Sequence, residues 1–567
     1  MVTDGGSGTC TFSTPLLFEN NYSSFASQHR TAAISHGIQY QSNGIVINRD
    51  EEYNTANKRL SWTHLSPQIL VSIVAFMLVT QPGINMVYSS IFMNHYEFTD
   101  VSELSWLTGI LVLSTSIGAI TIGVIMDLIG RKNALLLTCA MLLISWLIAS
   151  VDGHESMSLF YACRFFAGIG GGMTIGSVIY VSEIAHASYK QVLLSLNSVF
   201  FSVGVLFATA LGSLFPWHVV NITFLIYTAV TMALLVVFLP ESPVWLIRFG
   251  TVRAHEARCS LKRIYPRNDQ VFAEEWDRIM HVWRQPAPCY RPPITVQDCT
   301  LTSFRVVNPS THDRGKRRGR VRWWWWCWCT PQPTSVTRPA TVLAVVFLLQ
   351  QLSGCYPALF YSVPVFRSVV GCTDTKTGPS QMDTLIAFGV LRLLTSVVAC
   401  TLSPHIGRRR LLIASALVMA CSAALVAATC SPTASPLQLQ FQYDDDPTKT
   451  PVSLPLLPLV GIVAFACGSS AGVLVFPWTL VGELLPVTSR AVVGAALVSF
   501  AYVLMFVVLL AFPYFIAVDV GGGGGSVAVA FTVFAAVSLT MAVYVYVRLP
   551  ETLGKQCDEI ERQFTDP

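Results

Sequence analysis

The sequence predicts an all-α membrane protein with twelve transmembrane helices in two six-helix halves and with both termini in the cytoplasm. Three observations lead to this prediction: a shortage of charge, twelve long apolar stretches, and a set of motifs that occurs twice. Of the 567 residues, 53% are apolar and only 12% are charged, against about 25% charged in an ordinary soluble domain. The net charge of +4 also argues against a nucleic-acid binder, which needs a basic face.

The apolar stretches have the length of membrane spans, since about twenty residues of helix cross the hydrocarbon core of a bilayer. They cover residues 68–91, 104–126, 133–151, 157–180, 192–215, 219–239, 341–366, 382–404, 411–430, 455–480, 491–517 and 526–547. The expected divisions are a disordered cytoplasmic tail at 1–67, a first half at 68–240, a cytoplasmic loop at 241–340, a second half at 341–548 and a cytoplasmic tail at 549–567. No early apolar segment precedes residue 60, so we expect no cleavable signal peptide.

The orientation follows from the positions of the basic residues. The polar segment 241–340 holds nearly half of the 36 lysine and arginine residues, which places it in the cytoplasm by the positive-inside tendency. The loops that must then be cytoplasmic are all basic, and they contain Arg131 and Lys132, Lys190, Arg408 to Arg410, and Arg490. The long loop 431–454, with its aspartates, is expected outside.

Several motifs recur in the two halves at corresponding places. Gly130-Arg131-Lys132 ends the second span and Gly407-Arg408-Arg409 ends the eighth. Glu183 and Glu483 follow the fourth and tenth spans, each with a basic residue seven positions later, and Pro240-Glu241-Ser242 and Pro550-Glu551-Thr552 follow the sixth and twelfth. The chain is therefore interpreted as a duplicated six-helix unit, an arrangement typical of transporters with a central site.

Glycine and proline interrupt the first helix of every three-helix unit. The interruptions are Pro82-Gly83, Gly168 to Gly172, Gly354 with Pro357, and Pro477. Irregular backbone inside a membrane is tolerated where it lines a cavity or is buried in protein. We expect spans one, four, seven and ten to line the central site, although the glycine run could instead serve close helix packing.

Charged residues inside or at the ends of the spans are few enough to be informative. Carboxylates facing guanidinium groups across the cytoplasmic seam would lock that side when closed. The alternative, interfacial snorkelling, fits the arginines better than the duplicated glutamates. The expected intracellular gate consists of Asp127, Arg131, Lys132, Arg164, Glu183, Arg408, Arg409, Glu483 and Arg490.

In order along the chain, these motifs resemble those of the sugar porter family of the major facilitator superfamily, over roughly residues 68–560. Within the family the chain is most similar to the arthropod facilitated trehalose or glucose transporters. The motifs are Gly123-x-x-x-Asp127-x-x-Gly130-Arg131-Lys132, Arg164 with Tyr180-Val-Ser-Glu183, Pro240-Glu241-Ser242-Pro243, Gln350-Gln351-Leu352-Ser353-Gly354, Gly407-Arg408-Arg409, Pro477-Trp478 with Glu483, and Pro550-Glu551-Thr552-Leu553-Gly554-Lys555.

The resemblance implies a sugar site. Gln350 and Gln351 match the amide pair that binds sugar hydroxyls, and Trp478 matches the aromatic side chain on which a pyranose ring stacks. The chain departs from the family's pattern at several polar positions, which are here occupied by Ser198, Tyr356, Arg392, Ser470 and Met505. In addition, Pro404 stands where the family has an acidic residue before the second gate motif. The substrate-binding candidates are Gln350, Gln351, Trp478, Tyr356, Arg392 and Ser198.

Arg392 is the sharpest of these departures. A guanidinium that faces the cavity could bind a carboxylate or phosphate and move the substrate toward an acid. Alternatively, it pairs with protein groups or backbone carbonyls. The missing acidic residue at position 404 also predicts a looser gate in the second half.

The function favoured by these features is facilitative uniport of a sugar, a hexose or a disaccharide such as trehalose, across the plasma membrane. Proton-coupled relatives carry a carboxylate in the first span, where this chain has Thr80-Gln81-Pro82-Gly83-Ile84-Asn85. An organic-acid or polyol carrier and a non-conducting nutrient sensor remain as alternatives. We expect no enzyme activity, cofactor, metal, nucleic acid or obligatory protein partner. The segment of tryptophans at 323–328 would suit an anionic lipid surface or could be foreign to the protein.

Overall fold

The computed structural model describes residues 62–95, 101–151, 157–186, 189–247, 253–266, 269–284, 334–361 with 365, 381–430, 439–441, 452–454, 456–485, 490–517 and 525–551. These residues belong to one compact unit, Leu60–Pro567. We call 62–247 the first half and 334–551 the second half. The tail before residue 62, the tryptophan segment 323–328 and the C-terminal tail after residue 551 lie outside the described residues.

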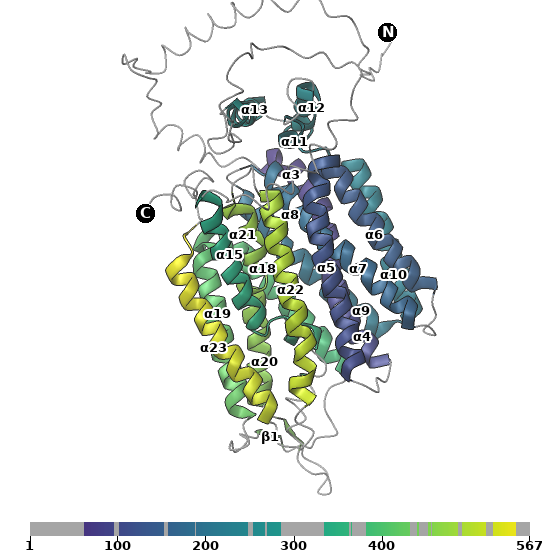
Figure 1. Ribbon diagram of the computed structural model, residues 1–567, viewed down its shortest axis with the longest axis vertical. Coiled ribbons are helices and arrows are strands. Elements are labelled where there is room, and N and C mark those ends of the chain that lie inside the picture. The colour runs from purple at the N-terminus through teal and green to yellow at the C-terminus, as the bar shows by residue number, and fades with distance from the viewer. Residues whose placement is uncertain are drawn as a thin grey trace, which may run out of the picture. The chain divides into compact units, whose positions relative to one another are not determined.

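The described part is almost wholly helical (Figure 1). Eight helices run without a break: α5 (Val101–Ile129), α6 (Arg131–Val151), α9 (Lys190–Leu214), α10 (Trp217–Phe238), α18 (Gln381–Ile406), α19 (Arg408–Thr429), α22 (Arg490–Ala517) and α23 (Gly525–Arg548). Each has at least the length of a membrane span. They correspond to predicted spans two, three, five, six, eight, nine, eleven and twelve.

The other four predicted spans are each broken near the middle, as the glycine and proline positions predicted. The first consists of α3 (Trp62–Phe76), the 3₁₀ turn η1 (Met77–Val79) and α4 (Thr80–His95), and the fourth of α7 (Met157–Met173) and α8 (Ile175–Ile184). The seventh passes from α15 (Thr334–Leu352) through a turn to α16 (Pro357–Phe360), and the tenth from α20 (Leu456–Gly468) through the π-helical turn η3 (Ser469–Val473) to α21 (Phe476–Leu484). Such local irregularities often mark functional positions.

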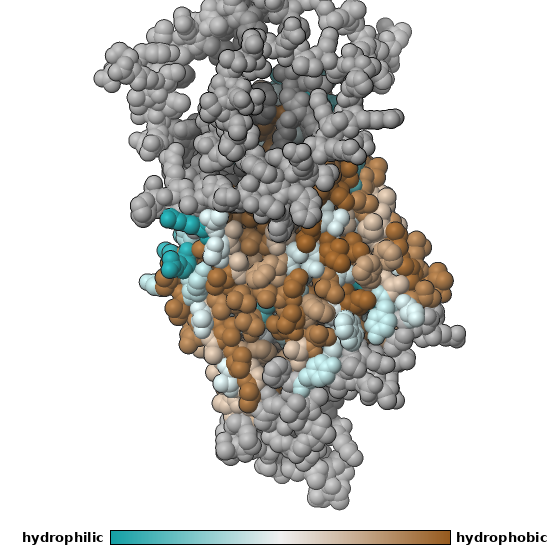
Figure 2. All heavy atoms as spheres, viewed as in Figure 1, coloured by the Kyte–Doolittle hydropathy of each residue, from teal (hydrophilic) through white to brown (hydrophobic). Residues whose placement is uncertain are grey.

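Among the described residues, eleven helical segments are long and apolar enough to cross a membrane, and the apolar helix Val336–Leu352 is shorter. That shorter helix belongs to the seventh predicted span, because the turn before α16 divides it. Leucine, valine, isoleucine and phenylalanine side chains remain exposed along the outer faces, and hydrophobic residues dominate the described surface in Figure 2. In water this surface would be unfavourable, so the protein is a multi-pass membrane protein.

The described part of segment 241–340 is more structured than the loop expected there. It contains α11 (Pro243–Ile247), α12 (Ala254–Ile264) and α13 (Asp269–Arg284). These helices contact one another, and α12 also contacts α3. His186, just after α8, lies 3.7 Å from Glu275 of α13, and burial lowers its pKa despite the nearby carboxylates of Glu275 and Glu274.

Two three-residue strands, β1 (Leu439–Phe441) and β2 (Val452–Leu454), pair antiparallel in the loop between α19 and α20. This small hairpin was not expected from the sequence. In Figure 1 it lies at the end of the helices opposite to α11, α12 and α13. We call the end where α5 meets α6 and α18 meets α19 the basic end, because Arg131 and Arg408 begin the following helices.

Candidate functional site

The halves meet along two pairs of helices, α5 with α22 and α9 with α18. In the middle of the second pair, the hydroxyls of Ser202 and Ser396 lie 2.7 Å apart. Toward the basic end, the Arg408 guanidinium donates to the backbone oxygen of Gln191 over 3.0 Å. Toward the opposite end, the hydroxyls of Thr108 and Tyr361 lie 2.6 Å apart. The halves therefore touch on both sides of the molecule's centre.

Between these contacts lies a central cavity of about 70 Å³, to which both halves contribute. All four broken spans supply residues to its wall, as expected for helices that surround the site. Among the described residues, no charged side chain lines it. The lining side chains are Val79, Pro82, Met86, Thr174, Ile175, Val178, Asn197, Ser198 and Phe201 from the first half, and Tyr356, Leu474, Val475, Trp478 and Tyr502 from the second.

The second half contributes an aromatic wall to this cavity. The Trp478 indole N–H donates to the Tyr356 hydroxyl over 2.9 Å. The Trp478 ring centre lies 5.0 Å from that of Tyr502 and 5.1 Å from that of Phe347. Ring contacts at these distances add to area burial in holding aromatic side chains in place. Trp478 is therefore fixed by three neighbours beside the cavity.

Several buried polar atoms of the predicted binding residues have no hydrogen-bond partner among the described residues; Ser198 lines the central cavity, whereas Gln350 and Gln351 are not among its lining residues. These atoms are both amide atoms of Gln351, Oε1 of Gln350 and the Ser198 hydroxyl. Gln350 uses its amide nitrogen to donate to the backbone oxygen of Val473, over 2.7 Å. Buried polar groups are nearly always paired in folded proteins, so these atoms form an unused set of donors and acceptors. The sequence predicted all three residues as substrate-binding candidates.

The structure also points to cavity residues that the sequence analysis did not single out: Phe201, Tyr502, Thr174 and Asn197. Phe201 follows Ser198 by three residues on α9, so both lie on one face of the helix. Applying that spacing to the Ser198 candidate would have found Phe201. Met505, one of the departures, instead borders a smaller cavity of about 20 Å³ with Tyr502 and Asn85. The Ser470 hydroxyl donates to the backbone oxygen of Ala466.

Arg392 of α18 is 2% exposed and lies beside the central cavity. Its guanidinium carbon is 4.8 Å from the centre of the Phe201 ring. The sequence left open whether Arg392 pairs with protein groups or backbone carbonyls. Among the described residues it makes no ion pair with a carboxylate and no hydrogen bond to a carbonyl, and its Nε is buried without a hydrogen-bond partner.

At the basic end of the first half, Arg131 joins two carboxylates. Its Nη2 lies 2.7 Å from Glu183 Oε1, its Nε donates to both Glu183 oxygens, and its Nη1 lies 3.0 Å from Asp127 Oδ1. Two-point contacts of this kind fix both partners in orientation. Glu183 also accepts a hydrogen bond from the Ser242 hydroxyl.

The corresponding cluster in the second half is sparser. Arg408 Nη1 lies 2.8 Å from Glu483 Oε1, but without the alignment of a hydrogen bond, and Nε of Arg408 has no partner among the described residues. Arg409 instead donates to the backbone oxygen of Tyr546. The looser second gate expected from Pro404 stays a prediction.

The expected geometry of the gate requires two corrections. Each carboxylate pairs with an arginine of its own half, not with one across the seam. Glu183 lies in the last turn of α8, which packs beside α6 and its Arg131, and Glu483 lies in the last turn of α21, next to Arg408. Arg164 does not join this group: its guanidinium donates to the backbone oxygen of Asn85 and to the Ser89 hydroxyl in the interior of the first half. The Arg490 side chain lies outside the described residues, and the Lys132 amine donates to the backbone oxygen of Val236.

The duplicated motifs meet within each half in a way that the sequence did not reveal. Gly130 and Gly407 have φ values of 97° and 88°, which glycine adopts at little cost. A methyl group at Gly130 would lie 2.5 Å from the Glu241 carboxylate, and one at Gly407 would lie 2.7 Å from that of Glu551. Glu241 also accepts the backbone N–H of Arg131 over 2.7 Å. In each half, the acidic residue that follows the sixth span of that half thus covers the tight turn between its second and third spans.

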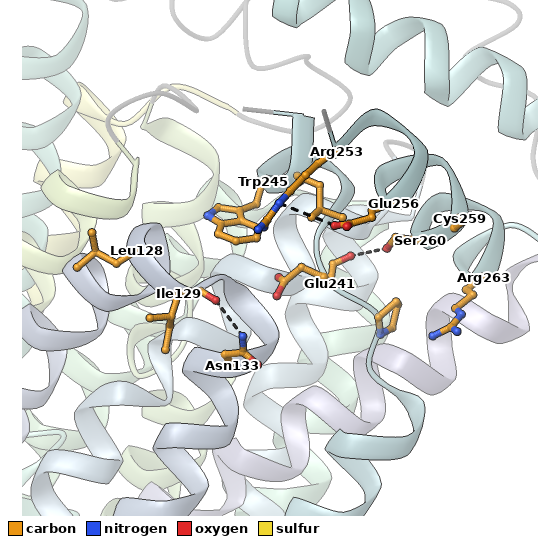
Figure 3. A pocket seen from close by; sticks show the side chains of 12 residues that line it. Leu128, Ile129, Asn133, Glu241, Trp245, Arg253, Glu256, Cys259, Ser260 and Arg263 are labelled. Carbon is orange, nitrogen blue, oxygen red and sulfur yellow. Dashed lines mark hydrogen bonds and ion pairs between the residues drawn. The ribbon is translucent and has the colours of Figure 1, made fainter. Parts of the chain in front are cut away.

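Glu241 also borders a larger cavity of about 640 Å³ at the basic end, formed by the α5–α6 turn, α11 and α12. Figure 3 shows that its walls are of mixed character, with Arg253 paired to Glu256 on one side and Leu128 and Ile129 on the other. Acidic and basic side chains both face it. Unlike the central cavity, its described lining comes from the first half and from residues 253–263, and none of it from the second half.

The whole chain is similar to known carriers. A family model described as sugar (and other) transporter matches residues 34–291 and 315–564. A facilitated trehalose transporter of Culex quinquefasciatus is 26% identical over 82% of this chain and 78% of its own length. A sugar transporter of Arabidopsis thaliana, ERD6-like 6, is 26% identical over 82% and 83%.

Among solved structures, the proton:xylose symporter XylE bound to 6-bromo-6-deoxy-D-glucose superimposes with a TM-score of 0.66 at 17% identity, covering 88% of this chain and 99% of that one. The human organic anion transporter MFSD10 gives a TM-score of 0.51 at 15% identity, covering 84% and 99%. These structures have the major facilitator fold. The protein is therefore a transporter and not an enzyme, and it belongs to the sugar (and other) transporter family.

Proposed function

We propose that this protein is a facilitative uniporter for a sugar, either a hexose or a disaccharide such as trehalose, in the plasma membrane. The supporting observation is the central cavity, where an aromatic wall and the Ser198 hydroxyl, unpaired among the described residues, lie between two halves that touch on both sides. A sugar presents ring faces to aromatic side chains and hydroxyls to such polar atoms. The trehalose transporters among the relatives agree with this choice.

The proposed topology has twelve spans, divided at the central segment, with the basic end and both termini in the cytoplasm. A cavity of about 70 Å³ is smaller than the roughly 300–1,000 Å³ of sites that hold small molecules. The halves must therefore part on one side to admit a substrate. On the cytoplasmic side this breaks the Arg408–Gln191 contact, and on the outer side the Thr108–Tyr361 contact.

Uniport is favoured because the interior of the first span offers no carboxylate to protonate. Gln81 accepts from the Trp146 indole N–H and donates to the Thr228 hydroxyl, and Asn85 donates to the backbone oxygen of Gln81. All of these partners are neutral. A proton gradient has no acidic group to act on there.

The test is uptake of radiolabelled trehalose and glucose by proteoliposomes, with and without a proton gradient. We expect saturable uptake that stops at equal concentrations and ignores the gradient. Trp478→Ala should raise KM by at least tenfold, whereas Trp106→Ala, at an exposed position of α5, should not. Uptake no greater than in empty vesicles would contradict transport and favour a non-conducting sensor, and accumulation driven by the gradient would contradict uniport.

A further inference from the structure

Arg392 differs from the other three arginines that are buried among the described residues. Arg131 and Arg408 each have a carboxylate within 3.0 Å, and Arg164 donates to Asn85 and Ser89. Arg392 has no carboxylate within 4.0 Å and no hydrogen bond in the part of the chain that the structure describes. It is nevertheless 2% exposed in the middle of a membrane-spanning helix.

A buried charge without a partner is strongly destabilising, because the guanidinium loses its hydration and gains little in return. The Phe201 ring, 4.8 Å away, offers a cation–π contact that offsets only part of this loss. Phe201 itself lines the central cavity. The uncompensated charge therefore stands directly behind the cavity wall, where a ligand could reach it after a small movement of that ring.

The cavity suits an anion for a second reason. Among the described residues, no aspartate or glutamate lines it, so none of them repels a negative charge there. The same cavity is lined by Trp478, Tyr356 and Tyr502, which present aromatic surface suited to a sugar ring. One guanidinium can bind one carboxylate through two parallel N–H···O bonds, which would satisfy the buried Nε and neutralise both charges.

We infer that the substrate of the central site is a sugar acid, a uronic or aldonic monocarboxylate, whose carboxylate binds Arg392 while its ring packs against Trp478. This inference rests on the proposed uniport through the central site, and it changes the substrate from a neutral sugar to a sugar acid. A phosphate ester offers similar oxygen atoms, but it carries up to two negative charges, and a single guanidinium would leave the second one buried and unpaired.

Radiolabelled glucuronate, glucose 6-phosphate, trehalose and glucose are offered separately to proteoliposomes that hold the full chain, under a membrane potential set by potassium and valinomycin. Uniport of a monovalent anion moves charge. An inside-positive potential of about 59 mV should therefore raise the accumulation of glucuronate tenfold. Uptake of either neutral sugar should ignore the potential.

Arg392→Gln should reduce glucuronate uptake at least tenfold, and Arg392→Lys should restore part of it. Arg548→Gln makes the same substitution at an exposed helix end and should leave uptake unchanged. If Arg392→Gln does not fold, the potential dependence of the wild type decides alone.

Three results would overturn the inference: no glucuronate uptake by a protein that carries glucose or trehalose, unchanged glucuronate uptake in Arg392→Gln, or a preference for glucose 6-phosphate. Uptake of glucuronate without uptake of glucose or trehalose would support the inference and overturn the neutral-sugar substrate of the proposed function, and failure to carry any of the four compounds would overturn transport itself.

Discussion

The two arginine clusters at the basic end should respond differently to the loss of one carboxylate. Arg131 is 1% exposed and contacts both Glu183 and Asp127. Glu183→Gln removes one negative charge, but Asp127 remains 3.0 Å from the guanidinium. Losing charge-assisted hydrogen bonds costs about 1.5–3 kcal/mol each, and the glutamine oxygen still accepts one. We expect a loss of about 2–3 kcal/mol in the free energy of unfolding.

Arg408 has no second carboxylate among the described residues. Glu483→Gln therefore leaves a wholly buried guanidinium with only the backbone oxygen of Gln191. Breaking a buried ion pair in this way costs about 3–5 kcal/mol. The sparser cluster should thus be the more sensitive one to a single substitution.

The redundancy at Arg131 has a further measurable consequence. Asp127→Asn alone should cost about 1 kcal/mol, since the Asp127 side chain is 25% exposed. Asp127→Asn together with Glu183→Gln leaves the arginine without either carboxylate, so the double variant should lose at least about 1 kcal/mol more than the sum of the single variants.

The assay is unfolding in detergent micelles at increasing SDS concentration, followed by tryptophan fluorescence. Glu256→Gln serves as the control, because the Glu256 side chain is 63% exposed and its surface ion pair should contribute less than about 0.5 kcal/mol. Additive costs at Asp127 and Glu183, or a smaller cost for Glu483→Gln than for Glu183→Gln, would refute this account of the clusters.

Three other predictions follow from contacts elsewhere in the molecule. Gly204→Ala would place a methyl group 2.1 Å from the Thr80 backbone oxygen, so it should cost about 1–3 kcal/mol in the same unfolding assay; an unchanged stability would mean that α4 and α9 separate easily. Burial lowers the pKa of His186 despite Glu275, so protonation below about pH 6.5 favours release of the imidazole. The opening equilibrium of α13, obtained from hydrogen exchange after division by the intrinsic exchange rate at each pH, should then rise between pH 7 and 5.5 in the wild type but not in His186→Gln. Equal pH profiles of this equilibrium would count against the prediction. The sequon at Asn221 should carry no glycan, because this residue is 1% exposed and both amide atoms are hydrogen-bonded; peptide mass spectrometry would reveal a modified form.

Much of the helical framework follows from the sequence because membrane thickness fixes the length of an apolar helix. The breaks follow too, since Pro82, Gly354 and Pro477 are poor residues for a helix interior. Helix ends outside the bilayer do not: α3 begins at Trp62, six residues before the predicted span, because its first turns are polar. The helices α12 and α13 escaped notice because a search for apolar runs does not detect amphipathic helices.

The sequence singled out the charged residues of the two clusters at the basic end, but it did not show which of them pair with one another. Equal spacings identified Glu183 and Glu483, yet a duplicated sequence cannot say which copy of an arginine each glutamate meets. Only the packing of α8 beside α6, and of η3, which leads into α21, beside α19, decides that each pair forms within its half. Likewise, Arg392 stood out by its charge, whereas its lack of a partner depends on every neighbouring helix.

The breaks in spans one, four, seven and ten affect stiffness as well as shape. A continuous helix tilts as a rod, so movement at one membrane surface is transmitted to the other. A helix interrupted at η1, at Thr174, at Gly354 or at η3 can bend at that joint, and one segment can tilt while the other stays in place. Substitutions that make these joints regular should therefore slow the exchange between open states more than they weaken the binding of substrate.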